Sequence, residues 1–103
     1  MNIKNKKILV AGLGTSGIAA VKMLLKLGAD ISIYDSKTKK EISDKTDLSD
    51  LAETRLILGK EPKDVSIFDF IVLSPGIPLD LSFIQRAKQK GIPIYGELEL
   101  AYK

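Results

Sequence analysis

The fold is decided by residues 8–35, which read ILVAGLGTSGIAAVKMLLKLGADISIYD. An uninterrupted apolar run, Ile8–Ala11, is typical of a parallel strand that is covered on both faces. After a glycine-rich turn, Ser16–Leu27 is apolar almost everywhere except at two lysines one turn apart, which predicts a helix that ends at Gly28. Ile31–Tyr34 is rich in β-branched and aromatic residues, as strands are. The stretch therefore predicts a strand–helix–strand unit.

Three further strands are predicted from short apolar runs at Arg55–Leu58, Phe70–Leu73 and Ile92–Tyr95. Strands that alternate with helices form a parallel sheet, because each right-handed crossover packs its helix back onto the sheet. We therefore predict an α/β fold of three layers, with a five-stranded parallel sheet in the order 3-2-1-4-5. This arrangement is Rossmann-like.

The segments between these strands are less regular. Lys37 to Asp50 is polar, rich in lysine and without a clear period, so we expect a loop with a short helix near Leu48–Glu53. Asp80 or Ser82 is expected to cap a later helix, since a glutamine follows Ser82 at capping-box spacing, and Gly91 is expected to end it.

The chain length sets the number of domains. One hundred and three residues correspond to one domain, residues 1–103, and the 45% of hydrophobic residues suffices for one core. Glu97–Lys103 begins another helical pattern that stops after about two turns. We therefore expect the chain to be cut from a longer protein.

The composition excludes several classes of chemistry and partner. Cysteine and histidine are absent, which removes thiolate nucleophiles, disulfides and the usual zinc ligands. The net charge of +3 is spread over the chain, and the few arginines and aromatics argue against a nucleic-acid partner. No apolar run approaches the roughly 18 residues of a membrane span. We expect a cytoplasmic protein that binds neither nucleic acid nor membrane.

The glycine-rich turn, Gly12–Gly17, reads GLGTSG. Its glycines permit a tight turn, a close approach of the backbone to a ligand, and close packing of helix on sheet. The helix that follows presents unpaired amides and a positive dipole end, which suit a diphosphate. Gly14, Thr15, Ser16 and Gly17 are therefore candidate binding residues. A tight turn without a ligand is the alternative.

Two other predicted strand ends meet the glycine-rich turn at one edge of the sheet. Asp35 can accept hydrogen bonds from ribose hydroxyls and repels a 2′-phosphate, or it is simply an exposed strand-end carboxylate. Ser74 to Pro78 holds two prolines and a glycine, and Gly76 leaves room for a flat ring or a phosphate. A rigid turn is the alternative for this loop.

Four sequence blocks together resemble a known family. They are GLGTSG at Gly12–Gly17, YDSK at Tyr34–Lys37, LSPGIP at Leu73–Pro78 and GIPIYGELEL at Gly91–Leu100. In this order they are similar to the N-terminal domain of the MurD-type, D-glutamate-adding branch of the Mur ligase family.

The resemblance implies that this domain binds the UDP moiety of UDP-N-acetylmuramoyl-L-alanine. The amides of Thr15, Ser16 and Gly17 would lie near the diphosphate. The other implied binding residues are Gly14 in the same loop, Asp35, Ser36 and Lys37 near uracil and ribose, and Ser74 and Gly76 along the nucleotide pocket. Lys37 stands where arginine is frequent in the family, and it lacks the planar guanidinium that stacks on a base.

The family's reaction needs groups that this chain lacks. The resemblance implies an ATP-dependent ligase of peptidoglycan synthesis, which serves the cell wall, cell shape and cell division. ATP and Mg would bind a central ATPase domain and D-glutamate a C-terminal domain, while no G-x-x-x-x-G-K-S/T motif occurs here. Glu97 and Glu99 are better explained by the dipole of a helix start than by acid/base catalysis. We therefore expect no catalytic residue, cofactor or metal ligand in this chain, and no activity from it alone.

Two rival interpretations remain open from the sequence. One is an NAD-binding regulatory or dehydrogenase module, because glycine spacing followed by a strand-end acid also suits dinucleotides. The other is a scaffold domain whose glycine-rich turn is purely structural.

Overall fold

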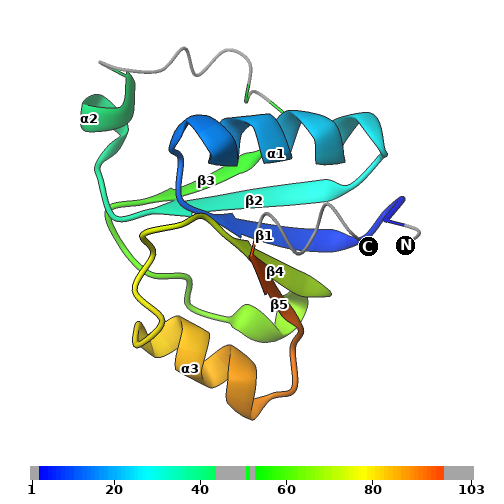
Figure 1. Cartoon of the computed structure of the whole chain (residues 1–103), viewed down its shortest axis with the longest axis vertical. Helices are drawn as coiled ribbons and strands as arrows, with labels where there is room; N and C mark the ends of the chain where they lie inside the picture. Colours follow the sequence, from blue (N-terminus) through cyan, green and yellow to red (C-terminus); the bar gives the residue numbers. More distant parts are fainter. Residues whose placement is uncertain (1–2, 44–50, 52, 97–103) are drawn as a thin grey trace.

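The computed structural model describes residues 3–43, 51 and 53–96. Its centre is a parallel sheet of five strands in the order β3-β2-β1-β4-β5 (Figure 1). The strands are β1 (Lys7–Ala11), β2 (Asp30–Asp35), β3 (Arg55–Leu58), β4 (Phe70–Leu73) and β5 (Ile94–Gly96). The predicted fold class and strand order are confirmed.

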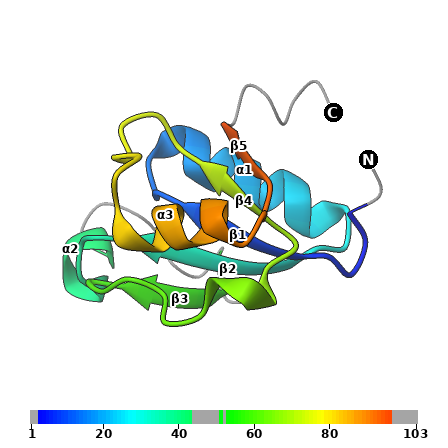
Figure 2. The same ribbon diagram turned by 90° about the horizontal axis from the view of Figure 1, so that it is seen from below.

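Helices cover both faces of the sheet. They are α1 (Thr15–Lys26), α2 (Lys39–Ser43), the short 3-10 helix η2 (Val65–Ile67) and α3 (Ser82–Gln89). Figure 1 places α1 and α3 on opposite sides of the sheet, and in Figure 2 α3 lies nearer the viewer than α1. The three-layer arrangement follows from the right-handed crossovers.

The core is divided between the two faces because side chains alternate along each strand. In β1, Ile8 and Val10 pack in a cluster with Val21 and Leu24 of α1. Leu9 belongs to a second cluster that includes α3 residues. All of these side chains are buried, so β1 is apolar at consecutive positions, as its sequence predicted.

Two elements differ from those expected. Within Lys37 to Asp50, predicted as a loop, Lys39–Ser43 forms α2 and buries Ile42. β5 begins at Ile94 because Pro93 has no N–H and the Ile92 N–H already donates to the Ala87 carbonyl at 3.0 Å. The short helix predicted near Leu48–Glu53 falls mostly outside the described residues. The pattern at 97–103 lies wholly outside them.

The predicted cap of α3 is wrong. The N-cap position is Leu81, and Ser82 is already the first helical residue. A remote carboxylate caps the helix instead: Glu61 Oε1 accepts from the Ser82 hydroxyl at 2.7 Å and from the Phe83 N–H at 2.9 Å. These two bonds lower the pKa of the Glu61 carboxyl, with a smaller contribution from nearby Arg86. The negative charge therefore lies where the helix dipole favours it.

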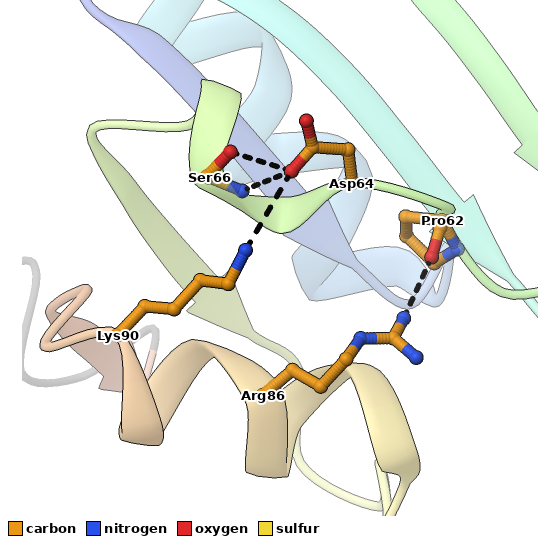
Figure 3. Close-up of polar contacts among 5 residues, drawn as sticks. All are labelled: Pro62, Asp64, Ser66, Arg86 and Lys90. Atoms are coloured by element: carbon orange, nitrogen blue, oxygen red, sulfur yellow. Dashed lines mark hydrogen bonds and ion pairs between the residues drawn. The ribbon is translucent and has the colours of Figure 1, made fainter.

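Figure 3 shows how the connection between β3 and β4 is tied to α3 further along. Arg86 Nη2 donates to the Pro62 carbonyl at 3.0 Å, and Lys90 Nζ lies 4.0 Å from Asp64 Oδ1. Asp64 also accepts from the Ser66 hydroxyl and amide, which lower the pKa of its carboxyl. Polar contacts thus join α3, and Lys90 directly after it, to the segment between β3 and β4.

Candidate functional site

The carboxyl ends of β1, β2 and β4 bring three loops to one edge of the sheet, on the left in Figure 1. They are residues 12–14, residues 36–38 and residues 74–78. Parallel α/β sheets bind ligands at this edge, where the strand order reverses next to the first strand. The structure therefore brings together the loops that hold the predicted site residues.

The glycines of the first loop have different roles. Gly12 has a φ of +105°, and a Cβ atom there would lie 2.8 Å from the Ser74 Cβ. A Cβ atom at Gly17 would lie 2.1 Å from the Gly12 carbonyl oxygen, so this glycine lets α1 pack against the loop. By contrast, a Cβ atom at Gly14 would have no described heavy atom within 4 Å. Gly14 therefore borders open space.

Helix α1 begins directly at that open position. Gly14 is its N-cap and has no side chain to cap it, and its first turn contains no acidic residue. The first intrahelical bond runs from the Ile18 N–H to the Gly14 carbonyl at 3.0 Å. The amides of Thr15, Ser16 and Gly17 precede that bond, and helix geometry gives them no partner within the helix. This arrangement suits an anion.

Asp35 is neither exposed nor isolated. Its carboxylate accepts one hydrogen bond from the Leu13 N–H at 2.8 Å and another from the Lys37 N–H at 2.9 Å. Its own carbonyl accepts from the Gly59 N–H at 2.9 Å. The residue thus links the glycine-rich loop to the loop after β2 and to the end of β3. No local sequence pattern indicates these links, because the Leu13 N–H lies 22 positions from Asp35.

Ser74, directly after β4, contacts the glycine-rich loop. It is only 8% exposed, and its hydroxyl donates to the Gly12 carbonyl at 3.0 Å. Ser36 and Lys37 are exposed, and Gly76 is exposed with a φ of +97°. Of the five predicted site residues outside the glycine-rich loop, Asp35 and Ser74 therefore support that loop, while Ser36, Lys37 and Gly76 are exposed.

Tyr34 precedes Asp35 at the carboxyl end of β2. Tyr34 is buried against the ring of Phe83, with the ring centroids 4.8 Å apart. Burial raises the pKa of its phenol, and the negative charges of Glu61 and Asp35 raise it further. The phenol therefore stays protonated. Among the described residues, no three carboxylates cluster closely enough to hold a metal ion, and Glu97 and Glu99 lie outside that range.

Comparison with known families decides the relationship. The model for "Mur ligase MurD-like, N-terminal domain" matches residues 6–96. The chain belongs to this family. The four sequence blocks therefore identified the family correctly.

Two similar curated proteins bear the same name. This MurD-like N-terminal domain is 44% identical over 104 residues to the UDP-N-acetylmuramoylalanine--D-glutamate ligase of Clostridioides difficile, and 41% identical over 106 residues to that of Alkaliphilus metalliredigens. Each match covers 100% of the chain but 23% of the relative. The chain thus spans about a quarter of the length of the relatives it matches.

Solved structures share the fold of the MurD-like domain. Precorrin-2 dehydrogenase SirC superposes with a TM-score of 0.56 at 18% identity. The match covers 91% of this chain and 45% of the SirC chain. Shikimate dehydrogenase from Aquifex aeolicus superposes with a TM-score of 0.55 at 19% identity. The match covers 97% of this chain and 45% of the dehydrogenase chain. At such identities the likeness concerns the fold alone. Within the described part of the chain, no helix is long and apolar enough to cross a membrane.

Proposed function

We propose that this domain binds the UDP moiety of UDP-N-acetylmuramoyl-L-alanine and belongs to a ligase that adds D-glutamate to it. The observation that carries the proposal is the open start of α1 at Gly14, in a chain whose relatives are named for this ligase. Three backbone amides converge there with the helix dipole, which is how proteins bind phosphate groups without cationic side chains.

The proposal assigns a role to each loop. The amides of residues 15–17 bind the diphosphate, and Gly14 leaves the backbone accessible. Ser36 and Lys37, both exposed beyond β2, contact uracil and ribose. Gly76 borders the pocket from the β4 side. Asp35 and Ser74 adjoin the ligand while they support the loop.

The chemical step belongs to other parts of the protein. ATP-dependent ligation requires a phosphate-binding lysine and Mg²⁺ ligands, and this chain has no P-loop motif. ATP, Mg²⁺ and D-glutamate therefore bind in the central and C-terminal domains of the full-length enzyme. The full-length enzyme acts in cytoplasmic peptidoglycan synthesis. The 103-residue domain alone binds the substrate but does not convert it to product.

The proposal is tested by NMR titration of the ¹⁵N-labelled chain with UDP, UDP-N-acetylmuramoyl-L-alanine and NAD. We expect UDP and the UDP-sugar to shift the amides of Gly14 to Gly17 and Ser36, and NAD to have a weaker effect. Preference for NAD would favour a dinucleotide-binding module. The absence of amide shifts with all three ligands would favour a scaffold domain whose glycine-rich turn is purely structural.

A substitution at Gly14 sharpens this test. Its φ of −76° and ψ of 179° are accessible to any residue, so Gly14→Val fills the ligand's space without straining the backbone. We expect Gly14→Val to abolish the UDP-induced shifts while the rest of the spectrum stays folded. Ala19→Val, at an exposed position further along α1, is the matched control and should bind as the wild type does. Normal UDP binding by Gly14→Val would refute the assignment of the loop.

A further inference from the structure

The carboxylate of Asp35 joins two loops that are distant in sequence. Oδ2 accepts from the Leu13 N–H at 2.8 Å, 22 positions earlier, and Oδ1 accepts from the Lys37 N–H at 2.9 Å. Leu13 immediately precedes the N-cap of α1, and Lys37 lies in the exposed loop after β2. One rigid, planar group thus fixes two backbone amides relative to each other.

The two joined loops are those that the proposed function gives to different parts of the ligand. The Leu13 side leads directly into the amides assigned to the diphosphate, whereas Ser36 and Lys37 are assigned to the uridine. A free inorganic pyrophosphate has no group that extends toward uridine. A change at Asp35 that alters pyrophosphate binding would therefore act through the position of the glycine-rich loop.

We propose that Asp35 is a positioning residue that couples the diphosphate half of the site to the uridine half. The inference rests on the proposed function and adds the coupling to it. The carboxylate holds the glycine-rich loop in its binding geometry before the ligand arrives, so that less ordering is required when the ligand binds.

Only a carboxylate satisfies both amides. Asparagine has nearly the same shape but offers one acceptor oxygen and one NH₂ group, and the NH₂ group would face a backbone N–H. Asp35→Asn therefore breaks one of the two links while filling the same volume.

The chain supplies two matched controls. Asp69 Oδ2 accepts from the Lys7 N–H at 2.7 Å, at the opposite edge of the sheet, so Asp69→Asn makes the same chemical change away from the loops. Ser36→Ala removes a group assigned to the uridine alone. Circular dichroism and thermal unfolding establish that each variant is folded.

The test is NMR titration of the four proteins with inorganic pyrophosphate and with UDP. We expect Asp35→Asn to weaken the binding of both ligands by roughly tenfold, as the loss of a charge-assisted hydrogen bond implies. Ser36→Ala should weaken UDP only, and Asp69→Asn should bind both ligands as the wild type does. If Asp35→Asn loses affinity for UDP but not for pyrophosphate, Asp35 is a direct contact and the coupling is refuted.

Hydrogen exchange in the absence of ligand separates this inference from the proposed function. The amides of Leu13 and Lys37 should exchange slowly in the wild type. Asp35→Asn should accelerate the amide whose bond it breaks directly and, if the two loops are coupled through this side chain, the other amide as well. If the wild type binds neither ligand, the proposed function fails, and hydrogen exchange alone tests the coupling. Faster exchange of both the Leu13 and the Lys37 amide in Asp35→Asn would then support it. Unchanged protection of either amide in Asp35→Asn would overturn it.

Discussion

At Gly17, helix propensity and packing oppose each other. Replacing a glycine inside a helix by alanine is ordinarily stabilising by up to about 1 kcal/mol. Here the new Cβ would lie 2.1 Å from the Gly12 carbonyl oxygen and 3.0 Å from the Ser74 Oγ. Because backbone must move to relieve this contact, we expect Gly17→Ala to lower the free energy of unfolding by about 1–3 kcal/mol.

Urea denaturation of Gly17→Ala and Gly14→Ala measures this effect. At Gly14, the N-cap of α1, a Cβ atom meets no described atom within 4 Å, so Gly14→Ala should lose only the preference of this position for glycine, less than about 1 kcal/mol in the free energy of unfolding. Equal effects at the two glycines would contradict the packing that the structure assigns to Gly17.

The hydroxyl of Ser74 forms a hydrogen bond with the same glycine-rich loop. It is buried and donates to the Gly12 carbonyl, so Ser74→Ala leaves that acceptor without this donor. We expect a loss of about 1–2 kcal/mol in the free energy of unfolding. Ser43→Ala is the matched control, because the exposed Ser43 hydroxyl also donates to a carbonyl, that of Lys40, and its removal should cost less than about 0.5 kcal/mol. The free energies of unfolding are measured by urea denaturation. If Ser74→Ala and Ser43→Ala lower them by similar amounts, burial does not strengthen the contribution of the Ser74 hydrogen bond to stability.

The sequence located the glycine-rich loop but not its supports. Glycine spacing is a local property, so Gly12 to Gly17 could be predicted from their order along the chain. The partners of Asp35 and Ser74 in this loop lie 22 and 62 positions away. No local pattern contains such distances. Asp35 was therefore predicted as a ligand contact or an exposed carboxylate, and Ser74 as part of a ligand-binding loop or a rigid turn.

At the scale of elements, α3 depends on a cap from another segment. The Glu61 carboxylate accepts from Ser82 and Phe83 at the start of the helix, 21 and 22 positions further along. Glu61→Gln keeps an acceptor but removes the charge, and we expect it to lower the free energy of unfolding by about 1 kcal/mol at neutral pH.

The same cap gives stability a dependence on pH. The pKa of Glu61 is lowered from 4.5 in the folded protein, so its contribution is complete above the unfolded pKa and is lost as pH falls through the folded one. Thermal unfolding should therefore show a difference between wild type and Glu61→Gln that is constant from about pH 7 to 6 and shrinks below about pH 5. Glu53→Gln, which removes a carboxylate from an exposed position away from the start of α3, is the control for the change in net charge. A difference that persists unchanged at pH 3 would exclude charge as its cause.

The error over this cap has a physical reason. Ser82 and a glutamine at the correct spacing satisfy the local rule for a capping box, but Ser82 donates its hydroxyl to Glu61 and is already helical. Similarly, α2 is short and has only Ile42 buried, so it left no periodic signal in a lysine-rich segment. Elements stabilised by a few tertiary contacts are the ones that sequence patterns miss.

At the scale of the molecule, the core has two halves that share one sheet. Ile31 lies in the cluster beside α1, and Ile84 lies in the cluster beside α3. Because every strand contributes to the same sheet, we expect Ile31→Val and Ile84→Val each to lower one common unfolding transition by about 0.5–1.5 kcal/mol.

Coincident unfolding curves from far-ultraviolet circular dichroism and tyrosine fluorescence would confirm this cooperativity. The double variant should lose the sum of the two single effects within about 0.5 kcal/mol, since the two side chains share no cluster. Separate transitions in either single variant would show that the two halves of the core unfold independently.

The strand order could be predicted because alternation of elements and handed crossovers leave few topologies open. Phe70–Leu73 was recognised as a buried strand from four consecutive apolar residues, and its place beside β1 followed from the order 3-2-1-4-5. The topology thus depends on rules that hold over the whole chain, whereas caps and loop supports depend on individual pairs of residues.

The central position of β1 has a consequence for synthesis on the ribosome. One neighbour, β2, emerges soon after β1, but the other, β4, begins only at Phe70. Until then a nascent chain carries an unpaired apolar strand edge, which invites association with other chains. Translation that stalls between Leu58 and Phe70 would leave this edge as a binding site for chaperones.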